Sequence, residues 1–279
     1  MKVKIWGARG SLPSPSPENS FFGGNTACVQ VTQGETFLVL DAGSGIRRLG
    51  DVFPSGFSRI DILLTHLHLD HIMGLGFFQP LYENGIQINI WGPAGSKDSL
   101  MARLKRYLSP PLFPVRLQDL PSQPAFFEID HSVFEIGPFK IKSDYICHPG
   151  PTIAYRIENG KAAIAYFPDH EPALGSSNFP NEPEWTSGFD LAYGVDLLLH
   201  DAQYSTDEYL PRIGWGHSSM QDALKFAEMA RVKKVLFFHH DPSHTDEYLL
   251  DLLEKSLERN HFPFEVGIAA EGSVFNFPV

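Results

Sequence analysis

Four residues with metal-binding side chains lie within six positions of one another in the segment Thr65–Gly74 (THLHLDHIMG). His66 and His68 are two residues apart, so in an extended segment both side chains point to the same side and can share one ion. Asp70 and His71 follow where the chain turns toward a helix, and they can serve a second ion nearby. Imidazole and carboxylate suit zinc and similar divalent metals. Incidental histidines in a polar loop explain one such residue but not four at this spacing, so the segment predicts a metal centre.

An apolar run, Arg59–Thr65, leads directly into these residues and predicts a buried strand. Other strands are expected at Lys2–Trp6, Ala27–Thr32, Thr36–Leu40, Ile86–Trp91, Phe126–Ile129, Val133–Ile136, Phe139–Tyr145, Val195–Leu199 and Lys234–Phe238. A hairpin of Thr152–Ile157 and Ala162–Phe167 is expected around the turn signal Asn159–Gly160. The strands fall mostly into two groups, each followed by helices, and two packed sheets with helices outside fit that order.

Helices are expected at Ile72–Phe78, at Lys97–Leu108, from Ser219 onward, and at Asp246–Asn260 after Thr245 as N-cap. The helix expected at Lys97–Leu108 has leucines on one face. Its basic residues are interpreted as a solvated face, and the steering of an anion is the alternative. They are Lys97, Arg103, Lys105 and Arg106.

Composition narrows the class of protein. The 279 residues, 43% hydrophobic and 20% charged, are expected to form one domain over residues 1–279. The first residues lack the apolar run of a signal peptide, and no stretch is long and apolar enough for a transmembrane helix. Because the chain has only two cysteines, Cys28 and Cys147, a disulfide framework is not expected. A cytoplasmic location is therefore expected. The formal net charge of −11 argues against non-specific binding to long nucleic acids.

The segment THLHLDH resembles the His-x-His-x-Asp-His signature of the metallo-β-lactamase superfamily. The resemblance implies an α/β fold, the four-layer αββα sandwich, and two divalent metal ions, for which zinc is expected and manganese or iron is also suitable. It implies further ligands at strand ends. Asp169 (in YFPDHE) would bridge both ions, and His239 fits the last position better than His240, which would lie behind it. The implied ligands are His66, His68, Asp70, His71, His148, Asp169 and His239.

The charge of such a site bears on the substrate. Two divalent ions carry four positive charges, and Asp70, Asp169 and a bridging hydroxide remove three, which leaves about +1. Residual positive charge suits an anionic substrate such as a phosphodiester. The ions would also lower the pKa of bound water from ~16 to ~7 and so generate hydroxide at neutral pH.

Two further stretches resemble the tRNase Z and cyclic-nucleotide phosphodiesterase branch of that superfamily. The opening WGARGSLPSP, with GGNTACVQV and LDAGSG, implies that Asn25 and Thr26 border the site and bind substrate; a simple turn before a strand is the alternative. Leu199–Ala202 (LHDA) and Gly216–Ser219 (GHSS) resemble a paired acid and histidine. Asp201 would orient His217 and keep it charged as the general acid, although the family usually has glutamate in place of Asp201.

These features together predict a metal-dependent hydrolase with Asp70, Asp201 and His217 in catalysis. The expected reaction is in-line attack of hydroxide on a small phosphodiester, such as a 3′,5′-cyclic nucleotide, with His217 protonating the leaving oxygen. The insertion Pro172–Gly194 contains no lysine or arginine, which disfavours a tRNA clamp. A lactonase or thioesterase, a tRNase Z-like endonuclease and a non-catalytic metal-binding domain are the alternatives. The resemblance also implies a homodimer.

Overall fold

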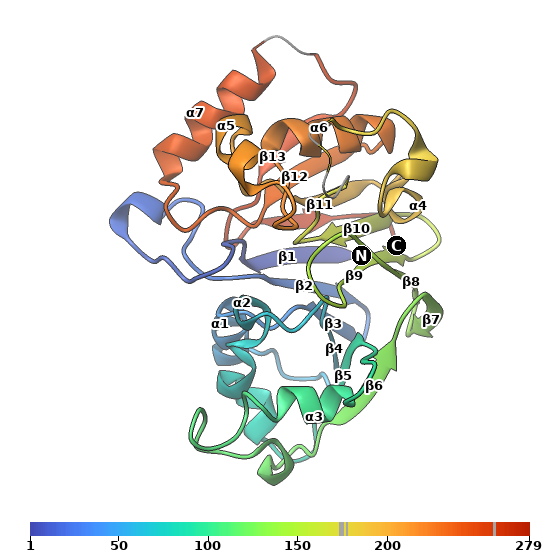
Figure 1. Ribbon diagram of the computed structural model, residues 1–279. Helices are drawn as coiled ribbons and strands as arrows, with labels where there is room; N and C mark the ends of the chain where they lie inside the picture. Colours follow the sequence, from blue (N-terminus) through green and yellow to red (C-terminus); the bar gives the residue numbers. More distant parts are fainter. Residues whose placement is uncertain (173–175, 177, 259–260) are drawn as a thin grey trace.

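Seven strands form the first of two sheets in the computed structural model (Figure 1). The structure describes residues 1–172, 176, 178–258 and 261–279. The spatial order of the seven strands is β14-β1-β2-β3-β4-β5-β6. The strands are β1 (Lys2–Gly7), β2 (Cys28–Gln33), β3 (Thr36–Leu40), β4 (Arg59–Leu63), β5 (Gln87–Pro93), β6 (Ala125–Ile129) and β14 (Val274–Asn276). The strands β3, β4, β5 and β6 run parallel to one another, so their carboxyl ends share one edge of the sheet.

The second sheet also has seven strands, in the order β13-β12-β11-β10-β9-β8-β7. They are β7 (Ser132–Ile136), β8 (Phe139–Tyr145), β9 (Ile153–Glu158), β10 (Ala163–Phe167), β11 (Leu197–Asp201), β12 (Lys234–Phe238) and β13 (Glu265–Ile268). The four strands from β10 to β13 are parallel. The predicted hairpin is confirmed, because β9 pairs antiparallel with β10.

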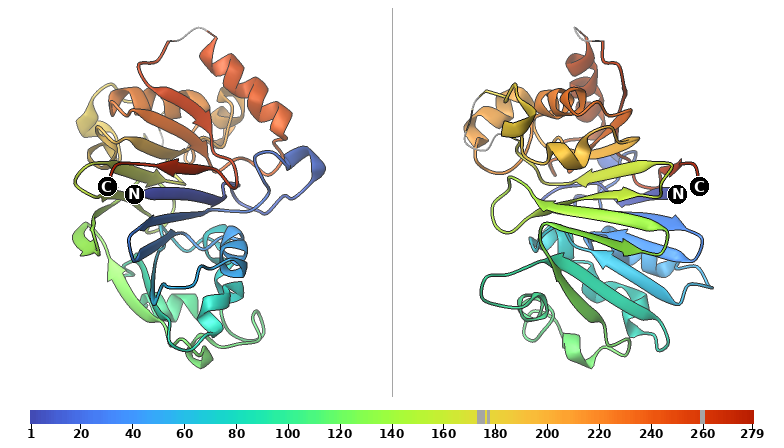
Figure 2. Two further views of the ribbon diagram at one scale, coloured as in Figure 1. Left: turned by 180° about the vertical axis from the view of Figure 1, so that it is seen from behind. Right: turned by 90° about the vertical axis from the view of Figure 1, so that its right-hand side faces the viewer.

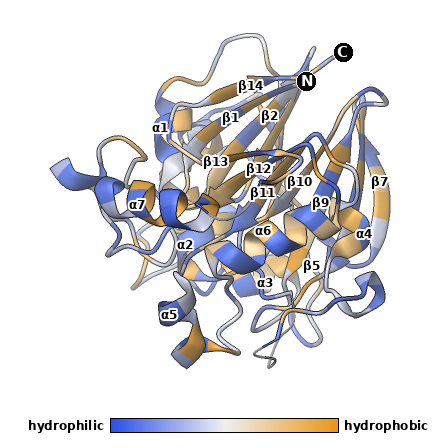
Figure 3. Cartoon of the chain, turned by 90° about the horizontal axis from the view of Figure 1, so that it is seen from above, coloured by the Kyte–Doolittle hydropathy of each residue, from blue (hydrophilic) through white to orange (hydrophobic). Residues whose placement is uncertain are grey.

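Helices cover the outer face of each sheet (Figure 2). Those associated with the first sheet are α1 (Gly45–Asp51), α2 (Leu69–Ile72) and α3 (Leu100–Leu104). Those associated with the second are α4 (Phe189–Ala192), α5 (Thr206–Tyr209), α6 (Met220–Met229) and α7 (Asp246–Leu257). Figure 3 shows both hydrophobic and hydrophilic residues on α6 and α7, as expected for helices with one buried face.

The hydrophobic core is divided into three layers by the alternation of side chains along the strands. On β3, Leu38 and Leu40 belong to the cluster between the sheets, whereas Phe37 and Val39 belong to the cluster beneath the first group of helices. A third cluster lies between the second sheet and its helices. Three apolar layers separate four layers of structure, which confirms the αββα sandwich.

Two predicted helices are shorter than expected. Ile72–Phe78 is not one helix: α2 ends at Ile72, and a separate 3₁₀ turn spans Leu75–Phe77. Gly74 between them lies so close to the backbone of Gly43 that a Cβ atom there would clash. The helix predicted at Lys97–Leu108 is α-helical only over Leu100–Leu104, because the Ser99 side chain caps it by accepting a hydrogen bond from the Ala102 amide.

The strands β6 and β7 follow each other in sequence but belong to different sheets. Periodicity within each strand could not reveal this crossover, because both read as short amphipathic segments. The caps at Ser219 and Thr245 agree with prediction, each accepting a backbone hydrogen bond at the start of its helix. The predicted end of the last helix at Asn260 lies outside the described residues. Among the helices described, none has the length and apolarity needed to cross a membrane.

Candidate metal centre

The segment after β4 is held in place by a buried aspartate that sequence reasoning missed. Asp41, in the left-handed region at a φ of 57°, accepts hydrogen bonds from the backbone amide and the hydroxyl of Thr65. Its Oδ2 atom also lies 2.8 Å from Nδ1 of His71 and accepts a bond from the Tyr166 hydroxyl of the second sheet. The carboxylate of Asp41 therefore fixes the position of the turn that carries the predicted ligands.

The first group of potential ligands consists of His66, His68, His148 and Asp169. Nε2 of His148 lies 3.1 Å from Nδ1 of His68. Nε2 of His66 and Nε2 of His148 each lie 3.7 Å from Oδ2 of Asp169. His66 and His68 come from the loop after β4, His148 from the loop between β8 and β9, and Asp169 from the end of β10.

A second group consists of Asp70, His71 and His239. Nε2 of His239 lies 3.1 Å from Oδ2 of Asp70 and 3.4 Å from Nε2 of His71. The left-handed backbone of His239, at a φ of 62°, turns the chain directly after β12. His240, the alternative ligand, instead donates from Nε2 to the carbonyl oxygen of Ala269. The structure therefore places His239, and not its neighbour, in the cluster.

Asp169 joins the two groups. Its Oδ2 atom faces His66 and His148, whereas its Oδ1 atom lies 2.9 Å from Nε2 of His71 and 3.3 Å from Nε2 of His239. One carboxylate therefore presents an oxygen to each group, which is the arrangement that a bridging ligand requires.

The donor set fits divalent cations. Nε2 of His66 is buried and has no hydrogen-bond partner among the residues that the structure describes. Two nitrogens bound to one tetrahedral zinc ion at ~2.0–2.1 Å lie about 3.3–3.4 Å apart. The nitrogen separations of 3.1 Å and 3.4 Å in the two groups are close to that value. Imidazole lone pairs held this close together repel each other unless a cation or a proton lies between them.

The electrostatics of the cluster favour neutral imidazoles in the first group. Burial lowers the pKa of His66, His68 and His148, which keeps their lone pairs available. His71 differs. Burial opposes its charge, but the carboxylates of Asp169, Asp70 and Asp41 outweigh burial and raise its pKa. A cation bound to the second group would have to displace that proton.

His217 and Asp201 form the predicted pair beside the cluster. Nδ1 of His217 lies 2.7 Å from Oδ2 of Asp201, and 4.0 Å from Oδ2 of Asp169. Burial alone would lower the pKa of His217, but Asp201 raises it to about 9. Asp201 also accepts hydrogen bonds from the backbone amides of Gln203 and Ser218, so its own position is fixed. The shorter aspartate reaches the histidine directly.

A buried glutamate, Glu171, organises the loop that carries His217, a role that no sequence pattern predicted. Its carboxylate accepts hydrogen bonds from the amides of Gly214 and Gly216 and from the hydroxyl of Tyr209. The carbonyl of Gly216 in turn accepts a bond from Nδ1 of His148 at 2.8 Å. Glu171 therefore orients His148 through the backbone of this loop.

Asn25 and Thr26 are not among the residues brought into the cluster. Thr26 is fully buried, and its hydroxyl accepts a hydrogen bond from the Ser44 amide. Asn25 accepts a bond from the Ser44 hydroxyl and donates to Glu271. These bonds hold the turn before β2, and contact of the two residues with a substrate stays a prediction. His200 is also structural in position, since it is buried and contacts His170 at 2.9 Å.

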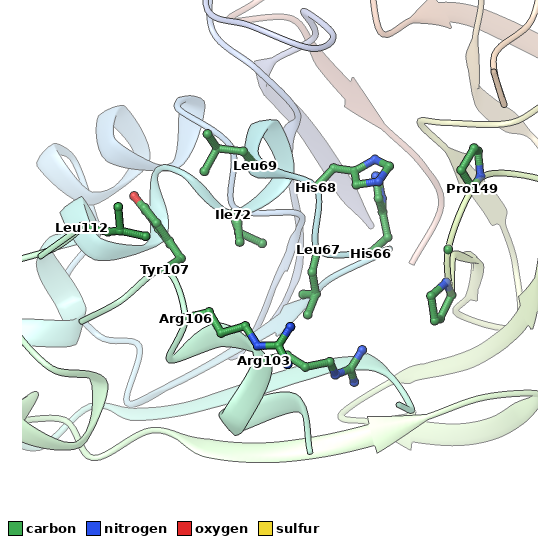
Figure 4. Close-up of a pocket in the computed structure, with 12 residues that line it drawn as sticks. His66, Leu67, His68, Leu69, Ile72, Arg103, Arg106, Tyr107, Leu112 and Pro149 are labelled. Atoms are coloured by element: carbon green, nitrogen blue, oxygen red, sulfur yellow. The ribbon is translucent and has the colours of Figure 1, made fainter. Parts of the chain in front are cut away.

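A cavity of about 450 Å³ opens beside the first group and has His66 and His68 in its wall (Figure 4). This volume lies within the range of small-molecule sites, ~300–1,000 Å³. Much of the remaining wall is apolar, and two arginines, Arg103 and Arg106, also line it. A substrate bound here would lie against the candidate metal ligands.

Comparisons with known proteins agree with this geometry. Residues 36–240 match the model of a beta-lactamase superfamily domain. A ribonuclease Z of Thermoplasma acidophilum is 26% identical, over 90% of this chain and 89% of its own. The metallo-beta-lactamase fold protein YhfI of Bacillus subtilis has a TM-score of 0.72 at 20% identity, over 98% of both chains. A diphosphatase of the PhnP family has a TM-score of 0.71 at 18% identity, over 100% of this chain and 98% of its own.

The family match covers more than half of the chain and includes both groups of potential ligands, from His66 to His239. The chain therefore belongs to the metallo-β-lactamase superfamily, and it is a metal-dependent hydrolase.

Proposed function

We propose that this hydrolase cleaves small phosphodiesters, for which a 3′,5′-cyclic nucleotide is the simplest candidate. The observation that carries the proposal is the position of His217, bonded through Nδ1 to Asp201 and 4.0 Å from the shared carboxylate of Asp169. A protonated imidazole at this place can supply a proton to a poor leaving group such as an alkoxide. Hydrolysis of an activated carbon ester has less need of such a donor.

His66, His68, His148 and Asp169 would hold one ion, and Asp70, His71, His239 and Asp169 the other. Bound divalent ions supply Lewis acidity and ionise water at neutral pH. Asp201 accepts the Nδ1 proton of His217, which leaves the Nε2 proton free for the departing oxygen. Water thus adds across one P–O bond, with hydroxyl going to phosphorus and the proton of His217 to the leaving group.

The charge of the cluster supports an anionic substrate. Four carboxylates lie beside the histidines, those of Asp41, Asp70, Asp169 and Asp201, and Asp201 is paired with His217. Asp41, Asp70 and Asp169 offset three of the four positive charges of two divalent ions, so the centre stays positive overall. Attraction of a phosphodiester anion into a buried positive site strengthens binding and stabilises charge on its oxygens.

RNA cleavage is the second candidate, because the Thermoplasma acidophilum relative is named ribonuclease Z and aligns over 90% of this chain. Against it stand the net charge of −11 and an insertion, residues 172–194, without lysine or arginine. A long polyanion needs basic surface to replace its counterions. A small diester needs only the centre itself and the cavity beside it.

Parallel assays of the zinc- or manganese-loaded protein test the proposal. The substrates are bis-p-nitrophenyl phosphate, 3′,5′-cyclic AMP, a precursor tRNA, a lactone and a thioester. We expect turnover of the small phosphodiesters to exceed that of the carbon esters and of the RNA. Faster hydrolysis of a lactone or thioester would reject the phosphodiesterase assignment, and selective cleavage of the precursor tRNA would favour the second candidate.

A further inference from the structure

The cavity beside the first ligand group has two chemically different ends. His66 and His68 lie at one end, and the guanidinium groups of Arg103 and Arg106 extend into the opposite side (Figure 4). Apolar side chains also line the cavity, among them Leu67, which lies between the histidines and the arginines, and Tyr107 and Pro149 (Figure 4). A ligand that fills this space therefore meets the candidate metal ligands on one side and two guanidinium groups on the other, with apolar side chains in the same wall.

Arg103 is held in a fixed position. Only 16% of its side chain is exposed, and its Nη2 atom donates to the backbone carbonyl of Pro93 and lies 3.3 Å from Glu128. Glu128 also accepts the backbone amide of Leu100, so its charge is shared with the start of α3. Within the described residues, Nη1 of Arg103 makes no hydrogen bond and Nε is buried without a partner. Because Nε is enclosed, Nη1 is the donor that remains for an anion, and the fixed position of the guanidinium prepares it for that contact.

Arg106 is exposed over 74% of its side chain and forms an ion pair with Asp98, which is itself half exposed. An exposed pair of this kind is weak, so a doubly charged phosphate can replace the carboxylate. The two arginines lie three positions apart, one turn along the helical segment, and therefore face the cavity together. Lys97, exposed on the same segment, is not among the residues that line it.

We propose that the substrate carries a second phosphate, which binds Arg103 and Arg106 while the scissile diester lies at the histidines. The apolar wall suits the flat face of a nucleobase. The preferred substrate is then a short linear nucleotide with a terminal phosphate, because a cyclic mononucleotide has no second phosphate for this end of the cavity. This inference rests on the proposed phosphodiesterase function and specifies its substrate.

The test compares a 5′-phosphorylated diadenylate, pApA, with ApA, which lacks the terminal phosphate but has the same scissile bond. The metal-loaded full chain is used, and bis-p-nitrophenyl phosphate serves as an independent diester. We expect kcat/KM for pApA to exceed that for ApA by about tenfold or more, as loss of a charge-assisted contact predicts. In Arg103→Gln this ratio should fall to within about threefold of unity, and Lys97→Gln should keep the ratio of the unaltered protein. The ratio is insensitive to a general loss of activity.

Each outcome has one meaning. A ratio near unity in the unaltered protein, with bis-p-nitrophenyl phosphate hydrolysed, overturns the second-phosphate site and leaves the phosphodiesterase function in place. An equal fall of the ratio in Lys97→Gln also overturns it, because a general charge effect then explains the preference. If none of the three diesters is hydrolysed, the proposed function itself fails. Should Arg103→Gln not fold, Arg106→Gln takes its place, since that side chain is exposed and its replacement disturbs no buried contact.

Discussion

The carboxylate of Asp41 lies 2.8 Å from Nδ1 of His71, on the opposite side of the ring from Nε2, which faces Asp169. A carboxylate in this position fixes the tautomer and orientation of a histidine ligand and raises its basicity. Asp41 is therefore a positioning residue for the second ligand group, although no sequence pattern predicted a chemical role for it.

Replacing Asp41 with asparagine should weaken metal binding. Loss of such an outer partner typically lowers affinity by about 10–100-fold. Isothermal titration calorimetry of the metal-free protein with zinc measures the affinity. Asp61→Asn is a matched control, because Asp61 is also buried but bonds to Arg59, Asn89 and Trp91 away from the cluster. Unchanged affinity in Asp41→Asn would contradict the role assigned to it.

His68→Ala should lose both bound metal and hydrolysis of bis-p-nitrophenyl phosphate, since it removes one of four donors to the first ion. Metal content by mass spectrometry and initial rates check this together. His131→Ala provides the control, because 83% of the His131 side chain is exposed and it lies on a different loop. Full activity of His68→Ala would reject the assignment of the centre.

His217→Ala should keep its metal and lose most turnover of diesters with poor leaving groups. General acid catalysis contributes about 10²–10⁴-fold, and a p-nitrophenolate leaving group needs little of it. The loss should therefore be much larger for 3′,5′-cyclic AMP than for bis-p-nitrophenyl phosphate. Equal losses for the two substrates would contradict the general-acid role, and loss of metal would show that His217 is a ligand.

The pH dependence of kcat should change when Asp201 is replaced by asparagine. Asp201 raises the pKa of His217 to about 9 in the metal-free protein, and nearby cations would lower that value. The acid must be protonated to act, so activity falls as pH rises through this pKa. In Asp201→Asn the alkaline limb should move to lower pH. A limb at the same pH in both proteins would mean that another group is titrating.

Glu171→Gln should destabilise the loop of residues 214–217, because an amide group cannot accept all the bonds that the buried carboxylate accepts from Gly214, Gly216 and Tyr209. One buried donor left unpaired costs about 1–3 kcal/mol. Urea unfolding of the metal-free protein measures the change. The exposed Glu184→Gln should leave the free energy of unfolding unaltered. A similar decrease in the free energy of unfolding of both variants would contradict the role assigned to Glu171.

The sequence predicted those parts of the molecule that depend on near neighbours. The spacing of His66, His68, Asp70 and His71 is local, and the strand Lys234–Phe238 before His239 was predicted with its exact bounds. Asp41 and Glu171 escaped prediction as members of the site because their roles depend on contacts with residues 24 to 125 positions away. For Arg103, the sequence offered the steering of an anion only as an alternative to a solvated face. Asn25 and Thr26 were predicted from a pattern to contact substrate; the structure shows their bonds to Ser44 and Glu271, and the contact with substrate stays a prediction.

The two sheets contribute different halves of the ligand set. His66, His68, Asp70 and His71 follow a strand of one sheet, whereas His148, Asp169 and His239 follow strands of the other. Cations bound at this site therefore link the two sheets to each other. Only the native alignment of the two sheets brings together all the ligands of each ion. Metal should then raise the melting temperature by mass action. A chelator should therefore weaken the packing between the two sheets first, while the backbone hydrogen bonds within each sheet persist.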